Sequence, residues 1–275
     1  MKRIVISMMV MAAVALPVSA QKLVVLHTND THSQIEPVRT GRNAGSGGVE
    51  RRMHFIDSVR AKYGADKVLL LDAGDYNQGT PYFNIGKGDL ERDLVNLMGY
   101  DVEAIGNHEF DNGQEEFARR LSGAKYPTVC CNYDFTGTPL EGYIKPYVIL
   151  KRGGFKIGII GATVRLRGMV SAQSLDGIGS LNTIDEVNRW AEYLKKEMRC
   201  DLVILLSHLG FDGGSEDNPS DKIVAANSRN IDFIIGGHSH TFLKEAAEVE
   251  NLDGVPVPIV QAGCKGIEIG ELKIY

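Results

Sequence analysis

Six of the seven histidines in this sequence belong to five short polar motifs, and every motif directly follows an apolar run. The motifs lie at 27–32 (HTNDTH), 72–75 (DAGD), 106–111 (GNHEFD), 207–208 (SH) and 236–240 (GGHSH). Imidazole together with carboxylate suits Zn, Mn, Fe or Co rather than the all-oxygen cage of Mg or Ca. Two such ions about 3.5–4 Å apart can clamp the attacking and leaving oxygens of a phosphoryl transfer, and a metal-bound water yields hydroxide at neutral pH.

Each motif by itself is weak evidence for a metal site. Asp-x-His and Gly-Asp sequences are common in turns, and His208 alone would be an ordinary hydrogen-bonded histidine at the end of a strand. All five motifs, however, follow apolar strand-like runs. Ligand sites in open α/β sheets form at the carboxyl ends of the strands. We therefore expect the five motifs to meet at one crevice.

The elements that must position these motifs alternate between apolar strands and amphipathic helices. We predict strands at 22–26, 68–71, 102–105, 127–131, 147–150, 155–161, 202–206 and 231–235, and a closing strand within 267–274. We predict helices at 49–63, 89–98, 114–121 and 183–199, the last with a capping box of Thr183 and Glu186. Turns at Gly153-Gly154 and Asp253-Gly254 predict two hairpins. Alternating elements of this kind indicate an α/β fold with a mixed sheet.

The N-terminus has the pattern of a secretory signal peptide at residues 1–20. Lys2 and Arg3 precede an apolar stretch of 13 residues at 4–16, which is shorter than the roughly 20 residues of a membrane-spanning helix. A small-residue cleavage pattern, Val18-Ser19-Ala20, comes before Gln21. We therefore expect a periplasmic or secreted protein whose mature part, residues 21–275, forms one catalytic domain.

Charge and cysteine content exclude several classes of function. The net charge of −5 becomes −7 without Lys2 and Arg3, and no basic stripe appears, so a nucleic-acid polymer is not an expected partner. Arg51-Arg52 is interpreted as part of a solvated helix face. No later apolar run predicts a membrane span. The four cysteines lack zinc-site spacing, and we interpret them as small buried hydrophobic residues.

The five motifs, in this order, resemble the signature of the calcineurin-like metallophosphoesterases. The stretches 69–75 (LLLDAGD), 78–80 (QGT) and 106–113 (GNHEFDNG) are similar to the catalytic domain of the 5′-nucleotidase family, which includes ecto-5′-nucleotidases and UDP-sugar hydrolases. The resemblance covers residues 22–275. It implies a four-layer α/β/β/α sandwich with mixed sheets, and a hydrolase that removes phosphate from nucleoside 5′-monophosphates or related esters by attack of a metal-bound hydroxide.

The resemblance also implies a role for each motif residue. One divalent ion is expected at Asp30, His32 and His240, a second at Asn107, His208 and His238, with Asp75 bridging the two. His108 and Asp111 resemble the family's catalytic dyad, in which the histidine stabilises the transition state or assists the leaving group and the aspartate orients it. Position 240 departs from nucleotidase relatives, which often have Asn or Gln there.

Residues near the motifs are interpreted as supporting or structural. Asp72, Glu109 and His27 are expected to support the site, and His54 is expected at the surface. The glycine-rich stretch 45–48 lacks the Lys-Ser/Thr of a phosphate-binding P-loop. It is interpreted as a flexible entry to the following helix, with phosphate binding as the lesser alternative.

Several readings of the function stay open. The family usually has a second domain that stacks the nucleotide base, and no such domain is expected in these 275 residues. A separate protein resembling that C-terminal domain is therefore a possible partner. Other enzyme activities are UDP-sugar, 2′,3′-cyclic nucleotide and sulfur-ester hydrolysis. The remaining alternative is a metal-binding module that acts only with a partner chain, against which the His108-Asp111 pair argues.

Overall fold

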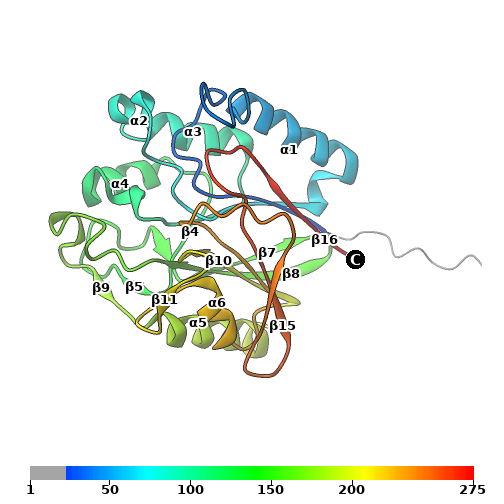
Figure 1. The fold of residues 1–275 in the computed structure, drawn as a ribbon. Coiled ribbons are helices and arrows are strands. Elements are labelled where there is room, and N and C mark those ends of the chain that lie inside the picture. Colours follow the sequence, from blue (N-terminus) through cyan, green and yellow to red (C-terminus); the bar gives the residue numbers. More distant parts are fainter. Residues whose placement is uncertain (1–22) are drawn as a thin grey trace, which may run out of the picture.

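The computed structural model describes residues 23–275. The predicted signal peptide, residues 1–20, lies outside the described residues. Two six-stranded sheets pack face to face, and helices cover both outer faces (Figure 1). This is the four-layer α/β/β/α sandwich with mixed sheets that the resemblance implied.

The first sheet has the strand order β16-β1-β2-β3-β4-β6. Strands β1, β2, β3, β4 and β6 run parallel to one another, and only β16 at the edge is antiparallel. The strands are β1 (Leu23–Thr28), β2 (Val68–Asp72), β3 (Val102–Ala104), β4 (Thr128–Val129), β6 (Ile144–Lys145) and β16 (Gly270–Ile274).

The second sheet has the strand order β14-β15-β13-β10-β8-β7. Its central strands are parallel, and each edge is an antiparallel hairpin whose turn contains one of the two predicted turn sequences, Gly153-Gly154 or Asp253-Gly254. The strands are β7 (Tyr147–Arg152), β8 (Phe155–Thr163), β10 (Leu202–His208), β13 (Phe233–Ile235), β14 (Ala247–Glu250) and β15 (Pro256–Val260).

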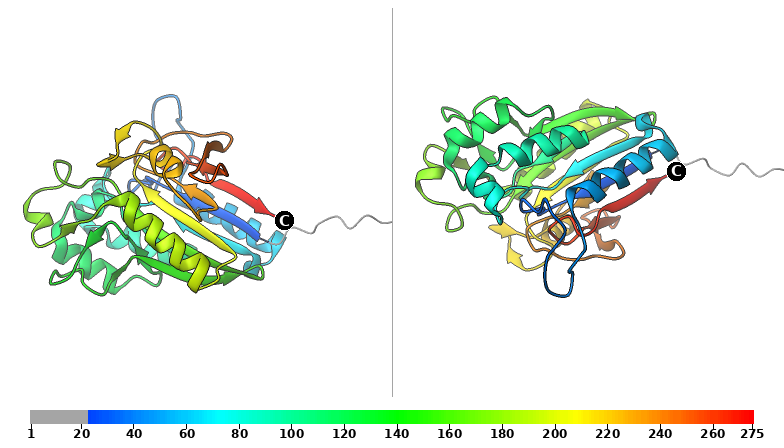
Figure 2. Two further views of the ribbon diagram at one scale, coloured as in Figure 1. Left: turned by 90° about the horizontal axis from the view of Figure 1, so that it is seen from below. Right: turned by 90° about the horizontal axis from the view of Figure 1, so that it is seen from above.

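The helices form the outer layers. Helices α1 (Val49–Tyr63) and α3 (Asp89–Met98) pack on the first sheet, while α5 (Thr183–Glu192) and α6 (Asp221–Ala226) pack on the second (Figure 2). Helices α2 (Pro81–Gly86) and α4 (Gly113–Ser122) lie beyond the carboxyl ends of β2 and β3. Smaller elements are the 3₁₀ turns 65–67, 108–110 and 173–175, and the two-stranded ladders β5–β9 (133–134, 179–180) and β11–β12 (214–215, 218–219).

The two sheets share an apolar core. Side chains from alternate positions of each strand fill the space between them, and the remaining positions face the helices. In β1, for example, Leu23 and Val25 face the second sheet, whereas Val24 and Leu26 face the helices. A strand buried on both faces reads as a continuous apolar run, which is why the sequence located these strands well.

Four local predictions were wrong in detail. The N-cap of α5 is Asn182, whose Oδ1 accepts the amide of Asp185 at 3.0 Å, so Thr183 does not cap the helix. The α-helix, predicted to reach residue 199, ends at Glu192, and a π-helical turn follows at Tyr193–Glu197. Arg52 is buried, and Cys264 is partly exposed, although the other three cysteines are buried as predicted.

Within residues 23–275, the structure has no helix that combines the length and apolar character needed to cross a membrane.

Candidate metal centre

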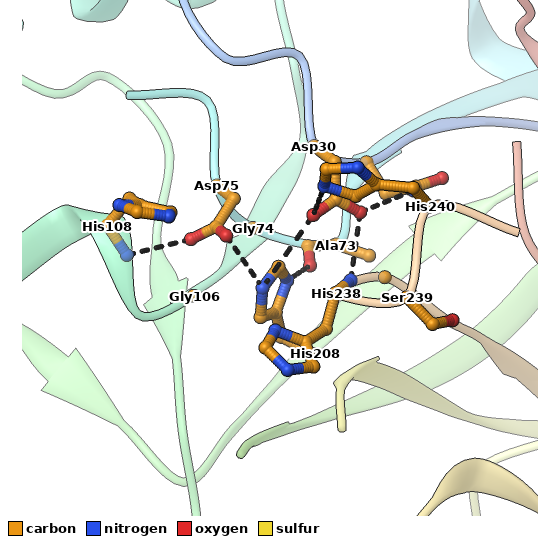
Figure 3. Close-up of polar contacts among 12 residues, drawn as sticks. Asp30, Ala73, Gly74, Asp75, Gly106, His108, His208, His238, Ser239 and His240 are labelled. Atoms are coloured by element: carbon orange, nitrogen blue, oxygen red, sulfur yellow. Dashed lines mark hydrogen bonds and ion pairs between the residues drawn. The ribbon is translucent and has the colours of Figure 1, made fainter. Parts of the chain in front are cut away.

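The five motifs converge at the carboxyl ends of the strands, as expected. Loops after β1, β2 and β3 carry Asp30, Asp75 and Asn107, and His208 is the last residue of β10. The loop after β13 brings His238 and His240 to the same place (Figure 3). Residues separated by more than 200 positions in the sequence therefore share one site.

The first group of side chains contains Asp30, His32 and His240. The Nε2 atoms of His32 and His240 are 2.9 Å apart, and they lie 3.8 and 3.3 Å from Oδ1 of Asp30. When several ligand atoms each lie about 2.0–2.2 Å from one zinc-like ion, their distances from one another are close to the three distances found here. This group therefore has the geometry of three ligands around a single ion.

The second group contains Asp75, His208 and His238. Nε2 of His208 lies 3.0 Å from Oδ2 of Asp75, while its Nδ1 hydrogen-bonds the carbonyl of Ala73 at 2.7 Å. A backbone acceptor at one ring nitrogen fixes the imidazole tautomer and leaves the other nitrogen for a metal. Asp75 also lies within ligand distance of His32 in the first group, which is the position that a bridging carboxylate requires.

Two buried oxygen atoms in the site lack a hydrogen-bond donor among the described residues. They are Oδ1 of Asp30 and Oδ1 of Asn107. Asp30 is completely buried, and its other oxygen accepts the amide of His238 at 2.8 Å. A buried acceptor without a partner is costly, and a cation beside each oxygen would satisfy it. The donor set therefore fits divalent metal ions.

Carboxylates dominate the electrostatics of the site. Burial of His208 opposes its protonation, but the carboxylates of Asp75 and Asp30 outweigh burial and raise its pKa to about 10. A site that holds a proton this strongly on an imidazole provides the negative potential that attracts a cation.

The backbone at the candidate ligands is strained. Five of the seven have positive φ angles: Asp30 (48°), His32 (45°), Asp75 (58°), His238 (70°) and His240 (53°). Such conformations cost about 1–3 kcal/mol each and concentrate at functional sites. The loops thus hold these side chains in orientations that a relaxed chain would avoid.

Glycines beside the ligands leave room for their close approach. A Cβ atom at Gly106 would lie 2.1 Å from Oδ1 of Asp75, and one at Gly74 would lie 2.9 Å from Nδ1 of His208. Neither contact is sterically possible. The glycines in the second and third motifs are therefore required by packing around Asp75 and His208.

His108 and Asp111 form a hydrogen-bonded pair at the rim of the site. Nδ1 of His108 and Oδ2 of Asp111 are 2.9 Å apart, and this contact raises the pKa of His108. His108 is half-buried, and its backbone amide donates to Oδ1 of Asp75 at 2.8 Å. The His108 ring also lies within ligand distance of His32 and Asp75, so a metal-binding role has to be tested separately.

The predicted supporting residues lie around the two groups. Glu109 accepts the amides of Gly106 and Asp75, and Asp72 accepts the amide of Gly74 at 3.0 Å. His27 is buried, where burial lowers its pKa to about 4, and His54 is exposed.

Arg120, which the sequence did not indicate, is completely buried and donates to the carbonyl of Glu109. No sequence signal distinguishes it from the other arginines of helix α4.

A cavity of about 450 Å³ opens onto the candidate ligands. Gln34, Gln78 and Lys265 line it in addition to motif residues. Gln78 belongs to the stretch 78–80 that the sequence singled out, whereas no motif indicated Gln34 or Lys265. Among the described residues, its lining contains no Phe, Tyr or Trp. The cavity thus offers charged and polar contacts around the metal ligands but no aromatic surface for a nucleobase.

Comparisons with known proteins agree with this geometry. The calcineurin-like phosphoesterase family matches residues 23–242. The chain is 35% identical to the snake venom 5′-nucleotidase of Crotalus adamanteus, over 96% of this chain and 47% of that protein. It is 34% identical to the 5′-nucleotidase of Homo sapiens, over 93% of this chain and 46% of that protein.

Solved structures give the same result. The 5′-nucleotidase precursor of Thermus thermophilus superimposes with a TM-score of 0.81 and 32% identity, over 92% of this chain and 51% of that one. The NAD nucleotidase of Haemophilus influenzae superimposes with a TM-score of 0.80 and 28% identity, over 91% and 46%. The chain spans about half the length of these relatives.

Proposed function

Because this chain belongs to the calcineurin-like phosphoesterase family, we propose that it hydrolyses phosphate esters, with nucleoside 5′-monophosphates as the substrate class. The observation that carries the proposal is the convergence of seven candidate metal ligands, five of which line one cavity, with buried oxygens of Asp30 and Asn107 left without donors among the described residues. The similarity to 5′-nucleotidases supports the choice of substrate class.

We assign two divalent ions, of Zn, Mn, Co or Fe, to the candidate centre. Asp75 would contact both. The first ion would be held by Asp30, His32 and His240, and the second by Asn107, His208 and His238. When bound, such ions polarise the phosphoryl group and acidify a water molecule. Mixed imidazole and carboxylate donors favour these metals over Mg or Ca.

The contribution of the protein itself centres on His108. Asp111 holds Nδ1 of the ring, which leaves Nε2 available to the substrate in the cavity. A protonated His108 can stabilise negative charge on the transferred phosphoryl group or give a proton to the leaving oxygen. The hydrogen bond that His108 donates to the Asp111 carboxylate favours that protonated form by raising the pKa of His108. Asp111 orients the ring and does not need to contact the substrate.

Recognition of the base is proposed to come from outside residues 23–275. The cavity lining has no aromatic side chain among the described residues, and the relatives are about twice as long as this chain. A domain that resembles the other half of those relatives, on this or a separate chain, would supply the stacking surface. Binding energy from remote parts of a substrate contributes to its orientation and hence to turnover. Residues 23–275 alone should therefore show a high KM for AMP.

A substrate panel tests this function. We expect metal-supplemented protein to hydrolyse AMP, other nucleoside monophosphates and p-nitrophenyl phosphate with similar kcat/KM. UDP-glucose and 2′,3′-cyclic AMP should be poorer substrates. A clear preference for either of the last two would replace the nucleotidase assignment. No hydrolysis of any ester by metal-loaded protein would favour a metal-binding module that needs a partner chain.

Export to the periplasm or the medium is also proposed, from the signal-peptide pattern at residues 1–20. N-terminal sequencing of protein from its native host should find a start near Gln21. Retention of Met1 in a cytosolic fraction would contradict export.

A further inference from the structure

Arg52 has a buried side chain without a hydrogen-bond or ion-pair partner among residues 23–275. Its side chain lies on the buried face of α1 together with Ile56 and Val59, and the residue is only 7% exposed. Its Nε atom is buried without a hydrogen-bond acceptor. Among residues 23–275 it forms no ion pair within 4.0 Å. Burial of an unpaired charge is expensive, so the position calls for an anion or ordered solvent.

A cavity of about 220 Å³ lies beside this guanidinium. The guanidinium packs against Gly266 of the cavity wall, where a Cβ atom would come within 2.7 Å of Nη1 of Arg52. Arg51, which is exposed, lines the same cavity and adds a second positive charge. The cavity therefore has two arginines along one wall.

The N-terminus of α1 opens at the same cavity. The helix has 15 residues, and its N-cap residue Gly48 provides no side-chain hydrogen bond. The amides of Gly48, Glu50 and Arg51 donate to no group among the described residues. Gly47 and Gly48 line the cavity and have positive φ angles of 72° and 95°. Free amides and the helix dipole at such an end favour an anion.

Two buried acids lie on the other side of Arg52 but do not contact it. Asp72 and Glu91 share with Arg52 a separate cavity of about 20 Å³, which has room for about one water molecule. Neither carboxylate lies within ion-pair distance of the guanidinium. Asp72 already accepts hydrogen bonds from Thr28 and Gly74, and Glu91 accepts one from Ser33. These acids support the loop after β1 and leave Arg52 without a direct partner.

We propose that the cavity formed by Arg52, Arg51 and the N-terminus of α1 binds a small tetrahedral oxyanion, phosphate or sulfate. Paired N–H groups of a guanidinium match two oxygens of such an anion, and the free helix amides can donate to a third oxygen. The site is separate from the candidate metal centre. Gly266 lines the anion cavity, whereas Lys265 lines the metal cavity and donates its amide to the carbonyl of Asp30 at 2.7 Å.

The proposal can be tested by calorimetric titration. The full chain, stripped of metal with EDTA, is titrated with sodium phosphate and with sodium sulfate at constant ionic strength. We expect saturable binding of both anions at one site per chain. Arg52→Met should weaken binding at least 10-fold. Lys62→Met, which removes the same charge from an exposed position of the same helix, should leave it unchanged. If Arg52→Met does not fold, Arg52→Gln provides the same comparison.

Three results would contradict the proposed anion site. The first is no saturable binding of either anion by the wild-type chain. The second is equal affinity in Arg52→Met and wild type. The third is binding that persists in Arg52→Met and disappears in His240→Ala, since that would place the anion at the candidate metal centre. None of these measurements uses catalysis, so the anion site and the proposed function can fail independently.

Discussion

The same strands build two regions of opposite character. Between the sheets, Leu69 of β2 and Ile204 of β10 are completely buried in an apolar core with regular strand geometry. A few residues further along each chain segment, Asp75 has a positive φ angle and His208 is a buried imidazole between two carboxylates. One end of each strand contributes hydrophobic stabilisation, and the other end holds polar groups that destabilise the metal-free protein.

The difference shows how the fold supports strained loops. Five ligand positions with positive φ cost about 1–3 kcal/mol each, and they persist because the strands before them are fixed by the core. Substitutions at the site should therefore change chemistry and metal content. Substitutions in the core should change stability and leave the chemistry intact. Each prediction below tests one side of this division.

The largest effect is expected from Asp75→Asn. Asp75 is the one carboxylate placed to contact both ions, so its loss should release both metals and reduce turnover more than any other single change. Elemental analysis and a phosphatase assay on the purified variant measure the two effects. Retention of two metals per chain by the variant would show that Asp75 does not bridge.

His108→Ala should lower turnover by about 10²–10⁴-fold, the usual contribution of acid–base assistance, while metal content stays near that of the wild type. Asp111→Asn should cost less, because it only loosens the ring that the 2.9 Å contact holds. The same two measurements apply. Loss of metal in His108→Ala would instead assign His108 as a ligand, which its distance to His32 and Asp75 permits.

Leu69→Ala should act on the other region. Removal of a fully buried leucine between the sheets should lower the free energy of unfolding by about 2–5 kcal/mol. At temperatures where the variant is folded, its kcat and metal content should match the wild type. Urea denaturation measures the first effect, and Leu97→Ala at an exposed position is the matched control. A large fall in kcat of folded Leu69→Ala would mean that core and site are not separable.

Glu103→Gln should produce the smallest effect, visible as a change in the pH dependence of stability. Glu103 is completely buried in β3, and burial raises its pKa well above the ordinary value. Because its pKa is higher in the folded than in the unfolded protein, Glu103 contributes its full stabilisation below the unfolded pKa of about 4.3. That stabilisation is lost as the pH rises toward the folded pKa, at about 1.4 kcal/mol per pH unit.

Urea denaturation across pH 4–8 checks the sign. The loss of stability with rising pH should be shallower in Glu103→Gln than in the wild type. The exposed Glu115→Gln should keep the wild-type slope. Identical slopes in Glu103→Gln and wild type would mean that Glu103 is ionised when buried.

Much of this contrast between apolar strands and the polar site at their carboxyl ends could be predicted from the sequence. Strands buried on both faces read as apolar runs, and the polar residues directly after them identify the carboxyl ends where sites form. The order of the motifs therefore predicted the fold and placed the candidate ligands together. Assignment of individual ligands to each ion remains a prediction that the variants above test.

The remaining features depend on three-dimensional packing. Positive φ at Asp30 or His240 arises from the loop path and has no marker in residue type. Arg52 was misplaced because its charge was taken to indicate solvent, although it precedes Ile56 by four positions and so shares its buried face. Glu103 is a similar case in strand β3: its charge suggests solvent exposure, but its apolar neighbours in the strand are buried and it is buried with them.

Metal content measured together with activity decides whether the protein uses two metal ions. We predict about two divalent ions per chain in active protein, loss of phosphatase activity on exhaustive chelation, and recovery as Zn, Mn, Co or Fe is returned to two per chain. Full activity after chelation, or with one ion per chain, would contradict a two-metal phosphoesterase.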